Sequence, residues 1–203
     1  MNKQKISKIL STMGLLFMIW LGISYVYYMK NRGDLLPAQI GVPDDFGNEF
    51  SRVTTMRREQ KMGSTPFLSP EGLSTDWADF KGEYLLVNFW ATWCGPCVIE
   101  LPSLGRLQQK MEDKGLKIIA VSLDLERPQD DIKQFLKNRG IGEFAAYLDH
   151  QQAIQKNIYM RGIPTSYLID PKGNIAYIFE GDAHWDSVVS VNFFENLLNQ
   201  EKL

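Results

Sequence analysis

The chain contains two cysteines, Cys94 and Cys97, which stand two residues apart in the stretch FWATWCGPCVIELP. The segment just before them, YLLVNFWA at residues 84–91, is the compact apolar run expected of a strand buried on both faces of a sheet. A helix is predicted to follow over about residues 94–114, because Pro96 suits a first helical turn, where its missing N–H costs nothing. A cysteine pair in this setting can be a redox pair, half of a metal site or a structural disulfide.

From about residue 65 onward, strand-like and helix-like segments alternate along the chain. Beyond the first strand and helix, strands are expected at 117–123, 145–148, 165–170 and 174–180, and helices at 127–140, 151–157 and 185–198. The last two strands flank the turn PKGN and should form a β-hairpin. This order predicts an α/β fold in which helices flank a central mixed sheet.

The first thirty residues have a different character. From Ile9 to Met29 no residue is charged, and such a run of about 21 residues would form a helix of roughly 31 Å, the thickness of a bilayer core. Tyr25, Tyr27 and Tyr28 gather at one end, where aromatic rings favour the lipid–water interface. The run therefore predicts a single transmembrane helix, and the lysines before it favour a cytoplasmic N-terminus with an exported C-terminal body.

Three segments follow from these patterns: 1–30 as cytoplasmic N-terminus and anchor, 31–64 as a tether, and 65–203 as the folded domain. Prolines and glycines interrupt the tether, and its second half could form a short amphipathic helix or remain a solvated spacer. A cleaved signal peptide is the alternative to the anchor. It would have a shorter apolar region and a small-residue cleavage site, and KNRGDLLPAQIG after the run supplies no convincing one.

The position of the cysteines fits thiol–disulfide exchange. At the start of a helix, unpaired N–H groups and the helix dipole stabilise the thiolate of Cys94, which would be the nucleophile. Cys97 lies about one turn later on the same side and could resolve a mixed disulfide. As a purely structural crosslink, the pair would close too small a loop to constrain much of the unfolded chain.

Other classes of site and partner find less support. Together with the two cysteines, His150 and His184 would give four metal ligands, but their spacing matches no zinc-finger pattern. A thiol pair can also bind Cu(I), so a copper metallochaperone remains an alternative. The formal net charge of −2 offers no basic field, which argues against nucleic acid as a partner. We expect no cofactor and no metal ligand.

Taken with the preceding strand and a later IPT segment, NFWATWCGPC resembles the active site of the thioredoxin superfamily. The added VIELP and the downstream RGIPTSYLIDPKGNI are similar to the membrane-anchored TlpA/ResA-like thiol–disulfide oxidoreductases of that superfamily. The resemblance covers about residues 66–198 and implies a thioredoxin-like fold with a redox-active Cys94–Cys97 disulfide. EGDAHWDS, at 180–187, looks most like a segment of TlpA itself.

The resemblance also implies a substrate groove beside the cysteines. Pro164 is the residue expected to follow a cis bond after Ile163, which would place extended backbone next to the pair. The same comparison offers a set of groove candidates: Trp93, Gly95, Pro96 and Ile163. Trp90 can be assigned equally well to the groove or to the core.

Glu100 is the expected proton-exchange partner of Cys97. It follows Cys97 by three residues, so both can share one helix face, and a carboxyl buried there would have a raised pKa. An acidic residue in the first turns of a helix is also common without a catalytic role, because it interacts favourably with the helix dipole. Cytosolic thioredoxins carry a buried aspartate where this chain has Asn88, so the resemblance assigns the proton relay to Glu100.

The resemblance extends to direction, partners and location. Gly95-Pro96 between the cysteines is the dipeptide of reducing thioredoxins, which predicts a disulfide reductase; a disulfide oxidase or isomerase is the alternative. An exported reductant needs electrons from a membrane donor of the CcdA or DsbD type. The similarity of EGDAHWDS to TlpA favours TlpA-like substrates, a copper-delivery protein and the CuA subunit of cytochrome oxidase. The alternative is the substrate of ResA and CcmG, the haem-attachment cysteines of apocytochrome c. The implied location is the bacterial cytoplasmic (inner) membrane, single-pass, with the domain on the periplasmic or extracytoplasmic side.

Overall fold

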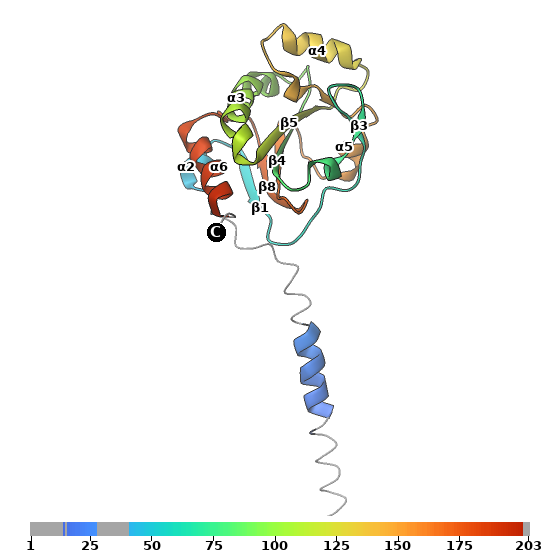
Figure 1. Cartoon of the computed structure of the whole chain (residues 1–203), viewed down its shortest axis with the longest axis vertical. Helices are drawn as coiled ribbons and strands as arrows, with labels where there is room; N and C mark the ends of the chain where they lie inside the picture. The colour runs from blue at the N-terminus through green and yellow to red at the C-terminus, as the bar shows by residue number, and fades with distance from the viewer. Residues whose placement is uncertain (1–13, 15, 28–40, 201–203) are drawn as a thin grey trace, which may run out of the picture. The chain divides into compact units, whose positions relative to one another are not determined.

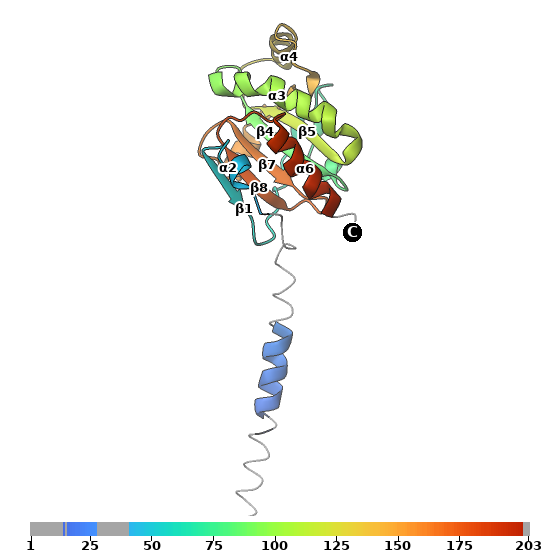
Figure 2. The same ribbon diagram turned by 90° about the vertical axis from the view of Figure 1, so that its left-hand side faces the viewer.

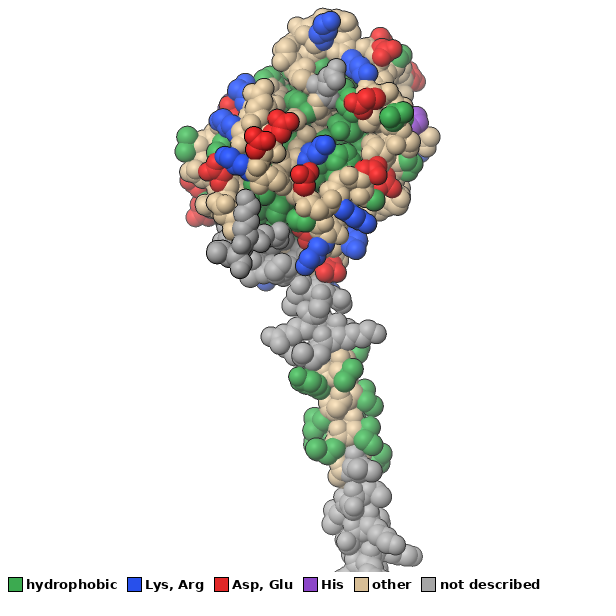
Figure 3. Space-filling model, viewed as in Figure 1, with side chains coloured by type: hydrophobic (Ala, Val, Ile, Leu, Met, Phe, Trp, Pro, Cys, Tyr) green, Lys and Arg blue, Asp and Glu red, His purple; other side chains and the backbone are tan. Residues whose placement is uncertain are grey.

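The computed structural model describes residues 14, 16–27 and 41–200. The chain divides into two units, residues 1–37 and 38–203, and each is considered by itself. In the first unit, residues 16–27 are helical, with large apolar side chains exposed along their length (Figure 3). No helix in the described part of the chain has both the length and the apolar character needed to cross a bilayer. The predicted span, 9–29, extends outside the described residues at both ends.

The second unit is built on an eight-stranded mixed sheet in the order β1-β8-β7-β4-β5-β6-β2-β3. Its strands are β1 (Arg52–Thr55), β2 (Phe67–Leu68), β3 (Ser74–Thr75), β4 (Tyr84–Trp90), β5 (Leu116–Ser122), β6 (Tyr147–Leu148), β7 (Thr165–Ile169) and β8 (Ile175–Glu180). At the centre, β4 runs parallel to β5 and antiparallel to β7. The mixed central sheet predicted from the sequence is confirmed.

Helices cover both faces of this sheet (Figures 1 and 2). They are α2 (Asp44–Gly47), α3 (Gly95–Met111), α4 (Gln129–Lys137), α5 (Ala153–Asn157) and α6 (Val188–Gln200), with short 3-10 turns at 77–80, 112–114 and 143–145. One apolar cluster joins α2, α3, α4 and α6 to the first face, and a second joins α5 and the 77–80 turn to the other.

The central strand β4 divides its side chains between the two clusters. All seven of its residues are buried. Leu86 and Trp90 belong to the cluster under α3 and α6, whereas Leu85, Val87 and Phe89 belong to the opposite cluster. Because strand side chains alternate between faces, Asn88 shares the face of Leu86 and Trp90. A polar side chain is thereby placed inside the apolar layer beneath α3.

The predicted tether, residues 31–64, is wrong for its second half. In the structure α2 buries Phe46 completely, and the ring of Phe46 stacks on that of Phe193 in α6 at 4.4 Å between centroids. Strand β1 pairs antiparallel with β8 along the sheet edge, so FSRVTT forms neither a spacer nor an amphipathic helix. Pro43 is the N-cap of α2 and Gly47 is its last residue, so both belong to a short helix. The folded domain therefore includes residues before 65.

Candidate active site

The cysteine pair lies where β4 ends and α3 begins. Cys94 is the N-cap residue of α3, and it forms a disulfide with Cys97, with 5.3 Å between the Cα atoms. The backbone N–H of Cys97 donates to the Sγ of Cys94 at 3.3 Å, as expected where helix N–H groups face a capping atom. Cys94 is 7% exposed and Cys97 is fully buried. This difference favours Cys94 as the sulfur that meets a partner and Cys97 as the resolving one.

The loop before β7 lies directly against this pair. The Ile163–Pro164 bond is cis, as the resemblance implied, and the carbonyl oxygen of Ile163 lies 3.8 Å from the Sγ of Cys94. The Pro164 carbonyl in turn accepts a hydrogen bond from the N–H of Gly181 at 3.0 Å. The fold therefore brings together residues about seventy positions apart in the chain; a substrate-holding role for Pro164 stays a prediction.

A hollow of about 870 Å³ opens beside the site. Trp93 and Ile163 contribute to its lining, together with the apolar side chains of Leu125 and Met160. Trp93 is 71% exposed and so presents most of its indole to solvent. The other two groove candidates, Gly95 and Pro96, are exposed but do not line this hollow. Charged side chains of both signs complete the wall: Asp124, Glu126, Arg127, Asp131 and Arg161.

Trp90, by contrast, belongs to the core. Its side chain is fully buried, and its indole N–H donates to the carbonyl oxygen of Ala145 at 3.1 Å. The two tryptophans are three residues apart in the sequence, but Trp93 lies at the surface and Trp90 lies in the core. Within the described part of the chain, no group of three or more His, Cys, Asp or Glu side chains is placed to hold a metal ion. The copper metallochaperone stays an untested alternative.

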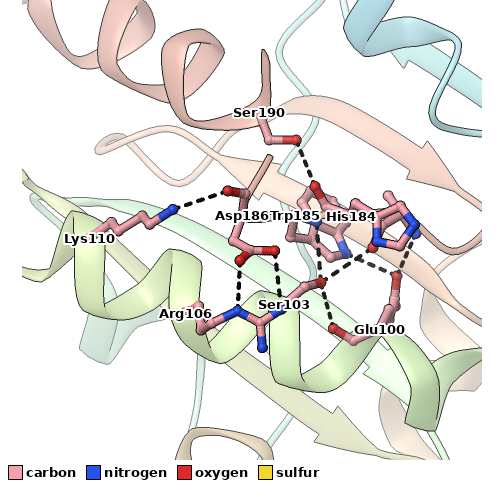
Figure 4. A network of polar contacts seen from close by, with 9 residues as sticks. Glu100, Ser103, Arg106, Lys110, His184, Trp185, Asp186 and Ser190 are labelled. Carbon is pink, nitrogen blue, oxygen red and sulfur yellow. Dashed lines mark hydrogen bonds and ion pairs between the residues drawn. The ribbon is translucent and has the colours of Figure 1, made fainter. Parts of the chain in front are cut away.

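Glu100 lies on the buried face of α3, one turn after Cys97, and is 3% exposed. Its carboxyl group accepts three hydrogen bonds. Nδ2 of Asn88 donates to Oε1 at 2.8 Å, while the indole N–H of Trp185 and the backbone N–H of Ala183 donate to Oε2 at 2.9 and 3.1 Å. Figure 4 shows Trp185 reaching this carboxyl from the segment after β8. The site thus combines a buried sulfur with a buried acid.

Burial raises the pKa of Glu100 from 4.5 to about 7. The cause is desolvation, which disfavours the charged carboxylate. The hydrogen bonds from Trp185, Asn88 and Ala183 act in the opposite direction, and the nearby charge of Asp182 adds slightly to the rise. A carboxyl with a pKa near neutrality can both accept and release a proton under ordinary conditions, as an exchange partner of Cys97 must.

We expect the raised pKa to make the stability of the oxidised protein depend on pH. Between pH 4.5 and about 7, folded Glu100 keeps a proton that the unfolded chain has lost, so the free energy of unfolding should fall as pH rises through this window. The full difference corresponds to about 3 kcal/mol. Denaturant unfolding at a series of pH values should show this slope for wild type and not for Glu100→Gln. An equal slope in both proteins would contradict the raised pKa of Glu100 as its cause.

Polar residues that the sequence motifs did not single out hold the turn before Cys94. The buried carboxylate of Asp124 accepts hydrogen bonds from the backbone N–H of Thr92 at 2.9 Å and from its hydroxyl at 2.7 Å. The hydroxyl of Ser122 donates to the same carboxylate at 2.7 Å. Ser122 is the last residue of β5 and Asp124 follows it by two positions; β5 is parallel to β4, so both strands end at the same sheet edge. The available signal in the sequence was a pair of polar residues directly after a buried apolar run.

The sequence motifs also do not reveal the hydrogen-bond partners of Glu100. The side chain of Asn88 donates to Glu100, while the expectation that the proton relay runs through Glu100 and not through Asn88 stays a prediction. In the sequence, EGDAHWDS shows only a resemblance; in the structure its Ala183 and Trp185 donate hydrogen bonds to the same carboxyl. Beside them, Arg106 of α3 pairs with Asp186 at 2.6 Å and fastens the segment to the helix (Figure 4).

Comparison with known proteins gives a consistent result. The model of the Redoxin family matches residues 49–198. The thiol-disulfide oxidoreductase ResA of Bacillus cereus is 36% identical over 133 residues, which cover 66% of this chain and 75% of the relative. A ResA of Bacillus thuringiensis subsp. konkukian is 36% identical over 112 residues, or 55% of this chain and 63% of the relative.

Solved structures extend the match to three dimensions. The solution structure of a thiol:disulfide interchange protein from Bacteroides sp. is 26% identical, with a TM-score of 0.56. The match covers 72% of this chain and 93% of that one. The cysteine pair at the start of α3 and these similarities support one assignment. The chain belongs to the Redoxin family and is a ResA/TlpA-like thiol–disulfide oxidoreductase of the thioredoxin superfamily.

Proposed function

We propose that this oxidoreductase works as a reductant, passing two electrons from its cysteine pair to disulfides of other proteins. The burial of Cys97 on the face of α3 that carries Glu100 is the observation that supports this direction most. A buried carboxyl beside a buried sulfur disfavours a second negative charge there, which destabilises the reduced form relative to the disulfide. Gly95 and Pro96 add no side-chain donor or cation that would stabilise a thiolate on Cys94.

The exchange has two steps. The thiolate of Cys94 attacks one sulfur of a substrate disulfide, that bond breaks, and the first substrate thiolate leaves. Cys97 then gives its proton to the carboxylate of Glu100 and attacks the Sγ of Cys94. The mixed disulfide breaks, the second substrate thiolate leaves, and the Cys94–Cys97 disulfide forms. Two electrons pass to the substrate, and Glu100 keeps one proton for later release.

For the substrate, we favour the haem-attachment cysteines of apocytochrome c, the class that the resemblance connects with ResA. The similarity of EGDAHWDS to TlpA had favoured the copper-delivery protein and the CuA subunit. That segment, however, makes internal contacts to Glu100 and α3. Because the segment is engaged in these internal contacts, its similarity to TlpA says little about which substrate binds to the protein surface. Both relatives described above carry the name ResA.

We further propose that residues 9–29 anchor the protein in the bacterial cytoplasmic membrane, with the domain on the extracytoplasmic side. The charge-free run supports this, as do the apolar side chains exposed at consecutive positions from Leu16 to Leu21, which surround the helix on all sides. In an oxidising compartment the reduced pair must be renewed, so a CcdA- or DsbD-type membrane protein is the proposed donor.

The reduction potential of the full-length protein tests the direction of electron flow. Equilibrated with glutathione and dithiothreitol buffers, the cysteine pair should have a potential near that of thioredoxin, about −270 mV. A value near that of DsbA, about −120 mV, would make the protein an oxidase or isomerase instead. Offering the reduced protein an oxidised C-x-x-C-H peptide and an oxidised CuA domain in parallel then tests the substrate. Faster oxidation by the CuA domain would overturn our choice.

A further inference from the structure

Asn88 in β4 has an unusual hydrogen-bond pattern for a fully buried side chain. Its Nδ2 donates to Oε1 of Glu100 at 2.8 Å and to the hydroxyl of Ser166 at 2.9 Å. Its carbonyl oxygen, Oδ1, is equally buried and has no hydrogen-bond partner among the described residues. An unpaired buried acceptor lowers stability, so its presence beside a reaction centre needs an explanation.

The neighbours of Glu100 supply the first part of that explanation. The backbone N–H of Ala183 and the indole N–H of Trp185 can only donate, and both point at Oε2. They suit a carboxylate, or the carbonyl oxygen of a neutral acid. When Glu100 is protonated, its hydrogen must therefore lie on Oε1 and find an acceptor there. In the orientation just described, the atom facing Oε1 is Nδ2 of Asn88, which cannot accept.

We propose that Asn88 is a two-position partner of Glu100, whose amide rotates by half a turn so that Oδ1 accepts the carboxyl proton when Glu100 is neutral. Rotation exchanges Nδ2 and Oδ1, so the unpaired atom becomes the nitrogen and the number of hydrogen bonds is preserved. Ser166 can follow because its hydroxyl both accepts and donates. Asn88 is thus a positioning residue that satisfies Glu100 in both charge states.

No other described group near Glu100 is suited to accept its proton. Besides Asn88 of β4, strand β7 contributes the uncharged Ser166. The segment after β8 contributes Asp182, which is exposed and can only add negative charge. His184, in the same segment, is also exposed. From α3 comes Cys97, whose sulfur carries no charge in the disulfide. Among the described residues that contact the Glu100 carboxyl, Asn88 is therefore the neighbour that can respond to the proton in the oxidised protein.

Nuclear magnetic resonance on the oxidised, isotope-labelled full-length protein tests this directly. We expect the side-chain amide signals of Asn88 and the carboxyl carbon of Glu100 to shift with one common midpoint. As pH falls, the amide protons should move upfield, because they lose their acceptors. Asn174 is an internal control: it is also buried, donates to Asp170 at 3.0 Å and has an unpaired Oδ1. Its amide signals should not share that midpoint.

The variant Glu100→Gln sharpens the test. Its amide oxygen can accept from Ala183 and Trp185 while its nitrogen donates to a rotated Asn88, so the Asn88 signals should keep their low-pH positions at every pH. Asn88 signals that stay fixed while Glu100 titrates would overturn the proposal, as would high-pH positions in the variant. If the variant does not fold, the wild-type titration alone decides. The inference rests on Glu100 as proton partner, but the readout needs neither substrate nor turnover, so it can fail independently of the proposed function.

Discussion

Replacing Cys94 with serine is expected to reduce disulfide-reductase activity to the uncatalysed background. The hydroxyl of serine stays protonated where a helix-terminal thiol ionises, and only the thiolate attacks a disulfide. We expect a loss of at least about a thousandfold in the rate of thiol release from an oxidised substrate peptide. Residual turnover clearly above that level would mean that Cys97 can begin the reaction, despite its complete burial.

The variant Cys97→Ser serves as the matched control. It should retain the first step and lose the second, so a mixed disulfide between Cys94 and the substrate should accumulate. Mass spectrometry would detect it as a covalent adduct that dithiothreitol removes. Cys94→Ser should form no such adduct with the same substrate. An adduct in both variants, or in neither, would contradict the roles that burial assigns to the two sulfurs.

Replacing Phe46 with alanine is expected to lower the free energy of unfolding by about 3–5 kcal/mol. The ring is fully buried between α2 and α6, and it packs on Phe50, Phe179, Phe193 and Phe194. Removing it leaves a cavity that the surrounding aromatic rings cannot fill without moving. Guanidinium unfolding, followed by tryptophan fluorescence, measures the change.

Leu73→Ala is the corresponding control, because it truncates a large apolar side chain that is 67% exposed. Its effect should stay within about 0.5 kcal/mol. A similarly small effect for Phe46→Ala would show that residues 41–64 are a dispensable tether after all. A large effect would place the start of the stable domain well before residue 65.

The centre of the fold was predictable because its signals are local. A seven-residue apolar run, a cysteine pair and a proline in the first helical turn are contiguous, and together they predict β4 and the start of α3. The hairpin of β7 and β8 follows in the same way from the turn around Gly173. The position of Pro164 beside Cys94 came from the resemblance alone, since no local pattern relates two residues so far apart.

What escaped prediction depends on tertiary contacts. Strand β1 is only four residues long, and all four side chains are exposed or partly exposed. It therefore shows no alternation of buried and exposed positions. Its strand character comes from pairing with β8. Trp185 and Glu100 are likewise adjacent only in the fold. Neither contact could be found from hydrophobic periodicity, which reports on which face of an element is buried and not on what covers that face.

The unequal burial of the two sulfurs has a consequence for kinetics. Because Cys97 is enclosed, a protein that reduces the pair and a protein that oxidises it must both react at Cys94, at the same surface and at different times. The two partners then exclude one another, and the enzyme alternates between two stable forms. Turnover should follow a ping-pong rate law, with parallel double-reciprocal plots and inhibition by whichever partner is in large excess.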